Sequence, residues 1–168
     1  MEKIVTSNPF IKSASLLIDF YKRNKIIILY SIISSIVTYG YELSKFTLSI
    51  DEEIQSFSTA SKGTVWIAQG RWVTYFINLL LSPHSITPYF PTLIAILCIA
   101  ISAILISNSL GGNLTSKLVF CTIFISIPSH AYYLAFNTFI ASCGIGTVLV
   151  VLSCIYYKNA VEHNKINI

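Results

Sequence analysis

The chain has 168 residues, of which 54% are hydrophobic and 11% are charged, and its formal net charge is +4. Soluble domains carry about 25% charged residues, and a soluble core of this size could not hide so much apolar surface. The composition therefore excludes an ordinary soluble domain and indicates an integral membrane protein. The modest, scattered positive charge also excludes the clustered basic face that nucleic-acid binding requires.

The amino-terminal residues 1–25 are predicted to form a cytoplasmic amphipathic segment. Residues 9–24 alternate apolar and basic side chains, which is typical of a short helix in the membrane interface. A first span is predicted at 26–43. No convincing small-x-small cleavage site follows it, so we interpret this span as an uncleaved anchor and not as a signal peptide.

Further apolar runs predict three more spans and a short tail. The spans are expected at 89–109, 117–136 and 139–157, and a cytoplasmic tail at 158–168. Each run approaches the roughly 20 residues that a helix needs to cross a bilayer. Pro128 is expected to kink the third span or to end it early. The run 73–81 is too short to span and is predicted to be interfacial or re-entrant.

The distribution of lysine and arginine predicts the orientation. Basic side chains precede the first span, mark the loop before the third and follow the fourth, whereas the short connection around 129–138 has none. Cytoplasmic loops carry the excess of Lys and Arg. Both termini are therefore expected in the cytoplasm, and the long loop 44–88 on the outward, periplasmic face.

Three residue types give little information about function. The four cysteines lie inside apolar runs and are interpreted as small membrane hydrophobes, not as disulfides or a zinc site. Four glycines (Gly111, Gly112, Gly144 and Gly146) do not form a GxxxG register, so the sequence does not specify which helices pair. His84 and His130 lie near span ends and are interpreted as interfacial polar groups.

The outward loop holds a polar island that begins with three consecutive acids, Asp51, Glu52 and Glu53. They follow Ser49, and the Ser-x-x-Glu pattern is a capping box that starts a helix. Apolar residues recur behind it at helical spacing, which predicts one face lying on the bilayer. The loop is thus predicted to open with a juxtamembrane helix that presents carboxylates.

A second juxtamembrane helix is predicted from Thr64 to Pro83. On it Arg71, Thr74, Tyr75 and Asn78 would form one polar stripe on an otherwise apolar rod. The predicted fold class is therefore all-α: a polytopic membrane protein of about four transmembrane helices, with two juxtamembrane helices in a long outward loop.

Two interpretations of this island remain open. Acids at a helix N-terminus serve capping and the helix dipole, and Arg71 with the two tryptophans could anchor the interface. Alternatively, the island holds a carboxylate base and a phosphate-binding guanidinium, with Gly70 allowing close approach beside Arg71. The second interpretation is favoured by the scarcity of acids elsewhere in the chain.

The segment Ser-Ile-Asp-Glu-Glu at 49–53, followed by Gln-Gly-Arg-Trp at 69–72 and placed directly after a first span, resembles a known family. It is similar to the amino-terminal part of GtrII-type glucosyltransferases, often prophage-borne, which modify bacterial O-antigen (lipopolysaccharide). The resemblance covers roughly residues 20–110. It implies a GT-C-like, multi-pass enzyme of the bacterial inner membrane, with a polyprenyl-phosphate-linked glucose donor and an O-antigen polysaccharide acceptor.

The resemblance also implies roles for individual residues. An acidic residue of the first outward loop would be the catalytic base, which assigns Asp51, with Glu52 and Glu53 as alternates. For the phosphate we ourselves choose Arg71, and we predict Gln69 and Trp72 of the same motif as further substrate- or phosphate-binding residues. No cofactor is implied with certainty. A divalent cation, Mg²⁺ or Mn²⁺, shared by the acids is considered because oxygen ligands suit it, but no metal-ligand set is assigned.

Family members are several times longer, so the chain is expected to be a truncated copy or a naturally short relative. An alternative function is therefore a non-catalytic small membrane protein, such as an accessory or flippase-like subunit, or an inactive truncated copy. The predicted spans hold almost no charged side chains, which argues against a transporter of charged substrates but not against a structural partner.

Overall fold

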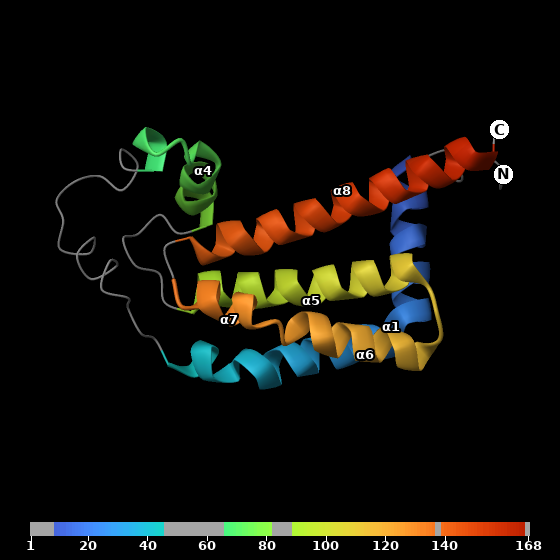
Figure 1. Cartoon of the computed structure of the whole chain (residues 1–168), viewed down its shortest axis with the longest axis horizontal. Coiled ribbons are helices and arrows are strands. Elements are labelled where there is room, and N and C mark those ends of the chain that lie inside the picture. Colours follow the sequence, from blue (N-terminus) through green and yellow to red (C-terminus); the bar gives the residue numbers. More distant parts are fainter. Residues whose placement is uncertain (1–8, 46–65, 82–88, 137–138, 167–168) are drawn as a thin grey trace.

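The computed structural model describes residues 9–45, 66–81, 89–136 and 139–166. In these ranges the chain is helical and contains no strand, which confirms the all-α prediction. The helices are α1 (Pro9–Ser44), α4 (Trp72–Leu81), α5 (Phe90–Leu110), α6 (Leu114–Ile125), α7 (Pro128–Leu134) and α8 (Ile140–Ile166) (Figure 1). Three of these helices are long and apolar enough to cross a membrane, or four when α6 and α7 count as one bent span.

The two ends of the bundle carry different elements (Figure 1). At one end, here called the loop end, α1 finishes, α5 and α8 begin, and α4 and α7 lie. At the other, the tail end, α5 and α8 finish and α6 begins. The side of the membrane that each end faces stays a prediction from the Lys and Arg distribution.

Helix α5 is the centre of the bundle, because α1, α6 and α8 all pack against it. In its most apolar window 56% of the residues are buried, against 22% in the corresponding windows of α1 and α8. The outer helices therefore present most of their apolar surface outward, as helices in contact with lipid do. Exposed apolar side chains on α1 and α8 include Leu29, Val37 and Val150.

Helix α1 joins the predicted interfacial segment and the predicted first span in one helix of 36 residues. At about 1.5 Å per residue it is longer than the roughly 30 Å hydrocarbon core. Its first part runs across the tail end of the bundle, and its later part runs along it (Figure 1). In that first part Leu16, Leu17 and Ile18 are exposed, and Lys22 and Arg23 follow them.

The buried face of α1 is more polar than its overall composition suggests. Asn24, Ile27, Ser31, Ser35 and Tyr39 are buried at spacings of three and four residues, so they form one stripe along the helix. Small residues let membrane helices approach each other closely. Lipid is itself apolar, so no hydrophobic effect drives the large side chains into the bundle. The serines thus serve the contact with the bundle, and the large aliphatic side chains face outward.

The third predicted span is broken at Pro128, as expected. Helices α6 and α7 are bent by 44° relative to each other, and Pro128 is the first residue of α7. Proline has no N–H and cannot continue the helical ladder, which frees carbonyl groups in the preceding turn. One of them, the carbonyl of Ile125, accepts a hydrogen bond from the Tyr39 hydroxyl of α1. Tyr30 adds a second hydroxyl link from α1 to α6, at 2.6 Å from Thr122 Oγ1.

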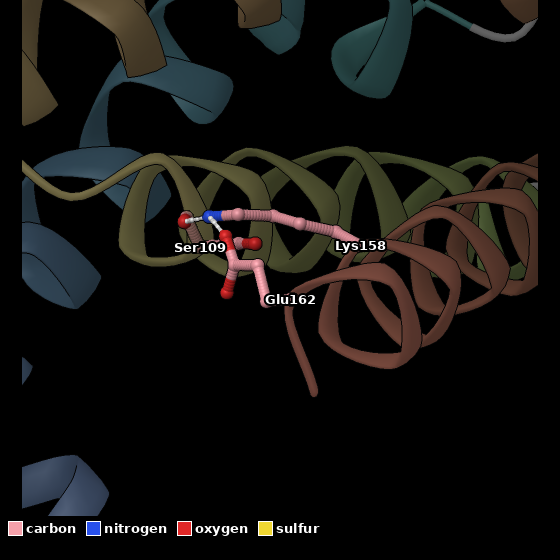
Figure 2. Close-up of polar contacts among 3 residues, drawn as sticks. All are labelled: Ser109, Lys158 and Glu162. Carbon is pink, nitrogen blue, oxygen red and sulfur yellow. Dashed lines mark hydrogen bonds and ion pairs between the residues drawn. The ribbon is translucent and has the colours of Figure 1, made fainter. Parts of the chain in front are cut away.

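Basic side chains hold the tail end together. The Lys117 ammonium donates to Asn108 Oδ1 at 2.8 Å, which joins α6 to α5. Lys158 of α8 donates to the Ser109 carbonyl in the last turn of α5 and lies 3.7 Å from Glu162 (Figure 2). A cation at the C-terminus of a helix stabilises its free carbonyl groups. Helix α8, which carries Lys158, continues to Ile166, whereas the fourth span was predicted to end at residue 157.

The pairing of α5 with α8 depends on one glycine. A Cβ at Gly144 of α8 would lie 2.8 Å from Ala95 Cα and 3.2 Å from Ala95 Cβ. The absence of a GxxxG pattern had left helix pairing unspecified. The structure shows that Gly144 and Ala95 form a close contact from two different helices, which no pattern within one helix can reveal.

Candidate functional site

The three predicted catalytic acids, Asp51, Glu52 and Glu53, lie outside the described residues, as do His84 and the predicted first juxtamembrane helix. Their roles therefore stay predictions. The structure does describe the other half of the motif, Gln69, Arg71 and Trp72, together with the segment that holds it.

Residues 66–71 form a helix end of the Schellman type. The Arg71 amide donates to the Trp66 carbonyl at 2.8 Å, and the Gly70 amide donates to the Ile67 carbonyl at 2.9 Å. These two bonds define the motif, and its left-handed position falls on Gly70, whose φ is 74°. The Arg71 carbonyl then accepts from the Tyr75 amide, which starts α4. Arg71 is thus the junction between one helical turn and the next helix.

This turn corrects one expectation. The second loop helix was predicted to run on from Thr64, but it is interrupted between residues 68 and 72. A Cβ at Gly70 would meet nothing within 4 Å, and the close approach of a ligand there stays a prediction. The glycine is required by its positive φ, which costs other L-residues roughly 1–2 kcal/mol. Glycine near the end of a helical pattern is a known stop signal and could have indicated the break.

The Arg71 side chain stacks on a buried tryptophan. Its Cζ lies 5.5 Å from the centroid of the Trp66 ring, within the range of a cation–π contact. Trp66 is only 6% exposed, and its ring meets that of Phe139 edge to face at 6.3 Å. The guanidinium is therefore held beside the start of α8, although its residue remains exposed.

Aromatic rings continue from Trp66 across the loop end. Phe139 stacks on Phe136 at 5.3 Å, and Phe136 meets Tyr132 of α7 at 5.6 Å. Exposed Tyr132, like Trp72, suits the aromatic belt where membrane meets water. Arg71 thus stands at one end of a row of rings that links the loop segment to α7 and α8.

Helix α4 has its polar side turned to the bundle and its apolar side turned outward. Thr74, Tyr75 and Asn78 are partly buried where α4 packs on α8, whereas Phe76 and Leu80 are 59% and 82% exposed. This polarity is the reverse of a soluble surface helix and fits one that lies in the membrane interface. The short run 73–81 therefore has the properties expected of an interfacial or re-entrant segment.

Gln69 and Trp72 flank the junction on either side of Gly70 and Arg71. Both are exposed, and Trp72, the first residue of α4, is 60% exposed. Within the described ranges no group of three His, Cys, Asp or Glu could hold a metal ion. Among the described side chains, the ion pair is the one between Lys158 and Glu162 at the tail end. Arg71 therefore has no carboxylate partner among them.

The comparisons with known proteins give one match. The family described as glucosyl transferase GtrII matches residues 40–166, which include the acids, the Arg71 junction and all helices from α4 to α8. No curated protein and no solved structure matches the chain. The match covers most of the sequence. This chain therefore belongs to the GtrII glucosyl transferase family.

Proposed function

We propose that the chain transfers glucose from a polyprenyl-phosphate-linked donor to a bacterial surface glycan of the O-antigen type, at the outward face of the inner membrane. The observation that carries the proposal is the position of Arg71, stacked on buried Trp66 at the start of α4. The family match supplies the reaction class.

Arg71 has the surroundings of a phosphate-binding group. The first amides of a helix have no intrahelical partners and carry the positive end of the helix dipole. In α4 these amides belong to residues 72–74, directly after Arg71. A guanidinium and a helix N-terminus are each suited to a phosphate, and here they adjoin. The outward apolar face of α4 would keep this site at the depth of a lipid phosphate.

The reaction requires a base and a stabilised leaving group. The acceptor hydroxyl attacks the anomeric carbon, its proton passes to a carboxylate, and the bond from that carbon to the phosphate oxygen breaks with its electron pair on the phosphate. We assign the base to Asp51, with Glu52 and Glu53 as alternates. The phosphate gains charge as it leaves, so Arg71 would bind it more strongly in the transition state than in the bound donor.

The test uses inner-membrane vesicles supplied with polyprenyl-phosphate glucose, radiolabelled in the sugar, and lipopolysaccharide as acceptor. One arm contains the chain alone. A second adds a longer member of the same family that has been inactivated at its own first-loop acids. Asp51→Asn should lower glucose transfer by about 10²–10⁴-fold. Arg71→Lys should lower kcat more than it raises KM, because an ammonium cannot form the bidentate fork.

Matched controls lie at the tail end of the bundle. Asp19→Asn and Arg23→Lys make the same chemical changes on exposed positions of α1 and should leave transfer at the wild-type rate. If Asp51→Asn and Arg71→Lys behave like these controls, the acids are caps and Arg71 is an interface anchor. If neither arm transfers glucose with the wild-type chain, the non-catalytic alternative replaces the proposal.

A further inference from the structure

Helix α7 buries a histidine whose hydrogen bonding is incomplete. His130 is 7% exposed, and its ring lies 5.3 Å from the Phe124 ring and 5.4 Å from the Tyr133 ring, centroid to centroid. It lies two residues after Pro128, where the span is broken. A buried polar group is costly unless it is hydrogen-bonded, so a buried histidine of this kind is a candidate functional group.

The two ring nitrogens of His130 have different environments. Nδ1 shares a hydrogen bond with the Tyr133 hydroxyl. Nε2 is buried and has no hydrogen-bond partner among the described residues. The Phe124 carbonyl interacts with the ring, but it does not form a hydrogen bond to Nε2 within the usual limits of distance and angle. Whichever way the Tyr133 proton points, Nε2 is left as a free donor or a free acceptor, since a neutral imidazole has one of each.

Other polar groups in the bundle find partners more easily. The Ile125 carbonyl, freed by the same break, is satisfied by Tyr39. Buried Ser31, Ser35 and Ser102 also have hydroxyl groups without partners, but a serine hydroxyl can rotate to a carbonyl of its own helix, as Ser107 does with Ile104. The imidazole cannot turn Nε2 to the backbone without giving up Tyr133. An unpaired buried group of this kind needs an explanation.

We propose that Nε2 of His130 binds an oxygen of the lipid-linked sugar phosphate, reached by a movement of α7 about the break at residues 126–127. The inference rests on the proposed function, because it adds a second contact for the same substrate. Helix α7 lies at the loop end with α4, and the row of rings from Tyr132 to Trp66 connects it to Arg71. A phosphate oxygen and a sugar hydroxyl offer the same hydrogen-bonding chemistry, and the experiment separates them.

Two substitutions distinguish the ring nitrogens. Asparagine places its amide near the position of Nδ1, and glutamine places its amide near that of Nε2. His130→Asn should therefore keep the link to Tyr133 but raise KM for the donor by about tenfold or more, the equivalent of one hydrogen bond to a charged group. His130→Gln should stay within about threefold of the wild type, a residual below 1 kcal/mol. The reverse order, with Asn active and Gln impaired, would assign His130 to packing through Tyr133 and overturn the proposal.

A binding measurement gives a readout that does not require turnover. The full chain with ¹⁵N-labelled histidine, in detergent, is titrated with farnesyl phosphate and separately with farnesyl phosphoglucose. The resonance lost in His130→Asn identifies His130. A shift of its Nε2 signal with both probes indicates the phosphate as partner, and a shift with the glucosylated probe alone indicates the sugar.

The outcomes separate this inference from the proposed function. One outcome is that the wild-type protein binds the probes and Arg71→Lys weakens this binding, but the Nε2 signal does not move. In that case His130 is not a ligand and the proposed function stands. If wild-type protein binds neither probe, both proposals fail. Thermal unfolding of each variant in detergent checks that a loss of binding is not a loss of fold.

Discussion

The Arg71 amide donates to the Trp66 carbonyl at 2.8 Å while the Arg71 guanidinium lies over the Trp66 ring, with 5.5 Å from Cζ to the centroid. One helix end therefore fixes both the backbone and the side chain of the arginine. In a Schellman motif the side chains at these two positions are normally apolar and contact each other. Here a cation takes the outer position, so a cation–π contact replaces the apolar one.

Replacing Trp66 by leucine should therefore weaken substrate binding without changing any charge. An exposed cation–π contact contributes about 0.5–1 kcal/mol, so KM for the lipid-linked donor should rise roughly two- to fivefold. The measurement is a donor titration in the vesicle assay. Val150→Ala, on the outward side of α8 and 63% exposed, is the control and should leave KM unchanged. An unchanged KM in Trp66→Leu would mean that the backbone turn alone positions Arg71.

Replacing Gly144 by alanine should separate α5 from α8. The new Cβ would stand 2.8 Å from Ala95 Cα, which is backbone and cannot rotate away. Overpacking of this kind costs about 1–3 kcal/mol, and the midpoint of thermal unfolding in detergent should fall. Gly146→Ala, on the same helix with nothing within 4 Å, should be neutral or stabilising. Equal midpoints for the two variants would contradict the close contact.

Replacing Tyr39 by phenylalanine should weaken the broken span. The change keeps the ring but removes the hydroxyl that serves the Ile125 carbonyl, so the free energy of unfolding should fall by about 1 kcal/mol. Thermal unfolding in detergent measures it. Tyr41→Phe is the matched control, since Tyr41 is 65% exposed on the same helix. A Tyr39 variant as stable as this control would show that water or a neighbouring group can satisfy the carbonyl.

The orientation can be tested with single cysteines at Ser58 and at Asn164, in a background without the four native cysteines. An impermeant reagent applied to intact cells should label position 58, in the predicted outward loop, and not position 164, near the end of α8. Labelling of 164 but not 58 would reverse the orientation and would place the proposed site in the cytoplasm.

The sequence by itself determined the class of the protein and the main apolar elements. Long uncharged runs can be stable only in a bilayer, and α5 was expected within one residue of its bounds, Phe90–Leu110. The break at Pro128 was also predictable, because proline removes a helical donor whatever surrounds it. The motif around Arg71 indicated the family, which the match over residues 40–166 shows.

Only the tertiary structure decided which residues meet across helices. Three contacts join segments far apart in the chain: that of Gly144 with Ala95, the bond from Tyr39 to Ile125 and the edge-to-face contact of Trp66 with Phe139. Local periodicity cannot specify such contacts, because in lipid both faces of an apolar helix are acceptable and small differences in packing select one. The incomplete hydrogen bonding of His130 emerged for the same reason: burial of a ring nitrogen depends on neighbours that only the folded bundle supplies.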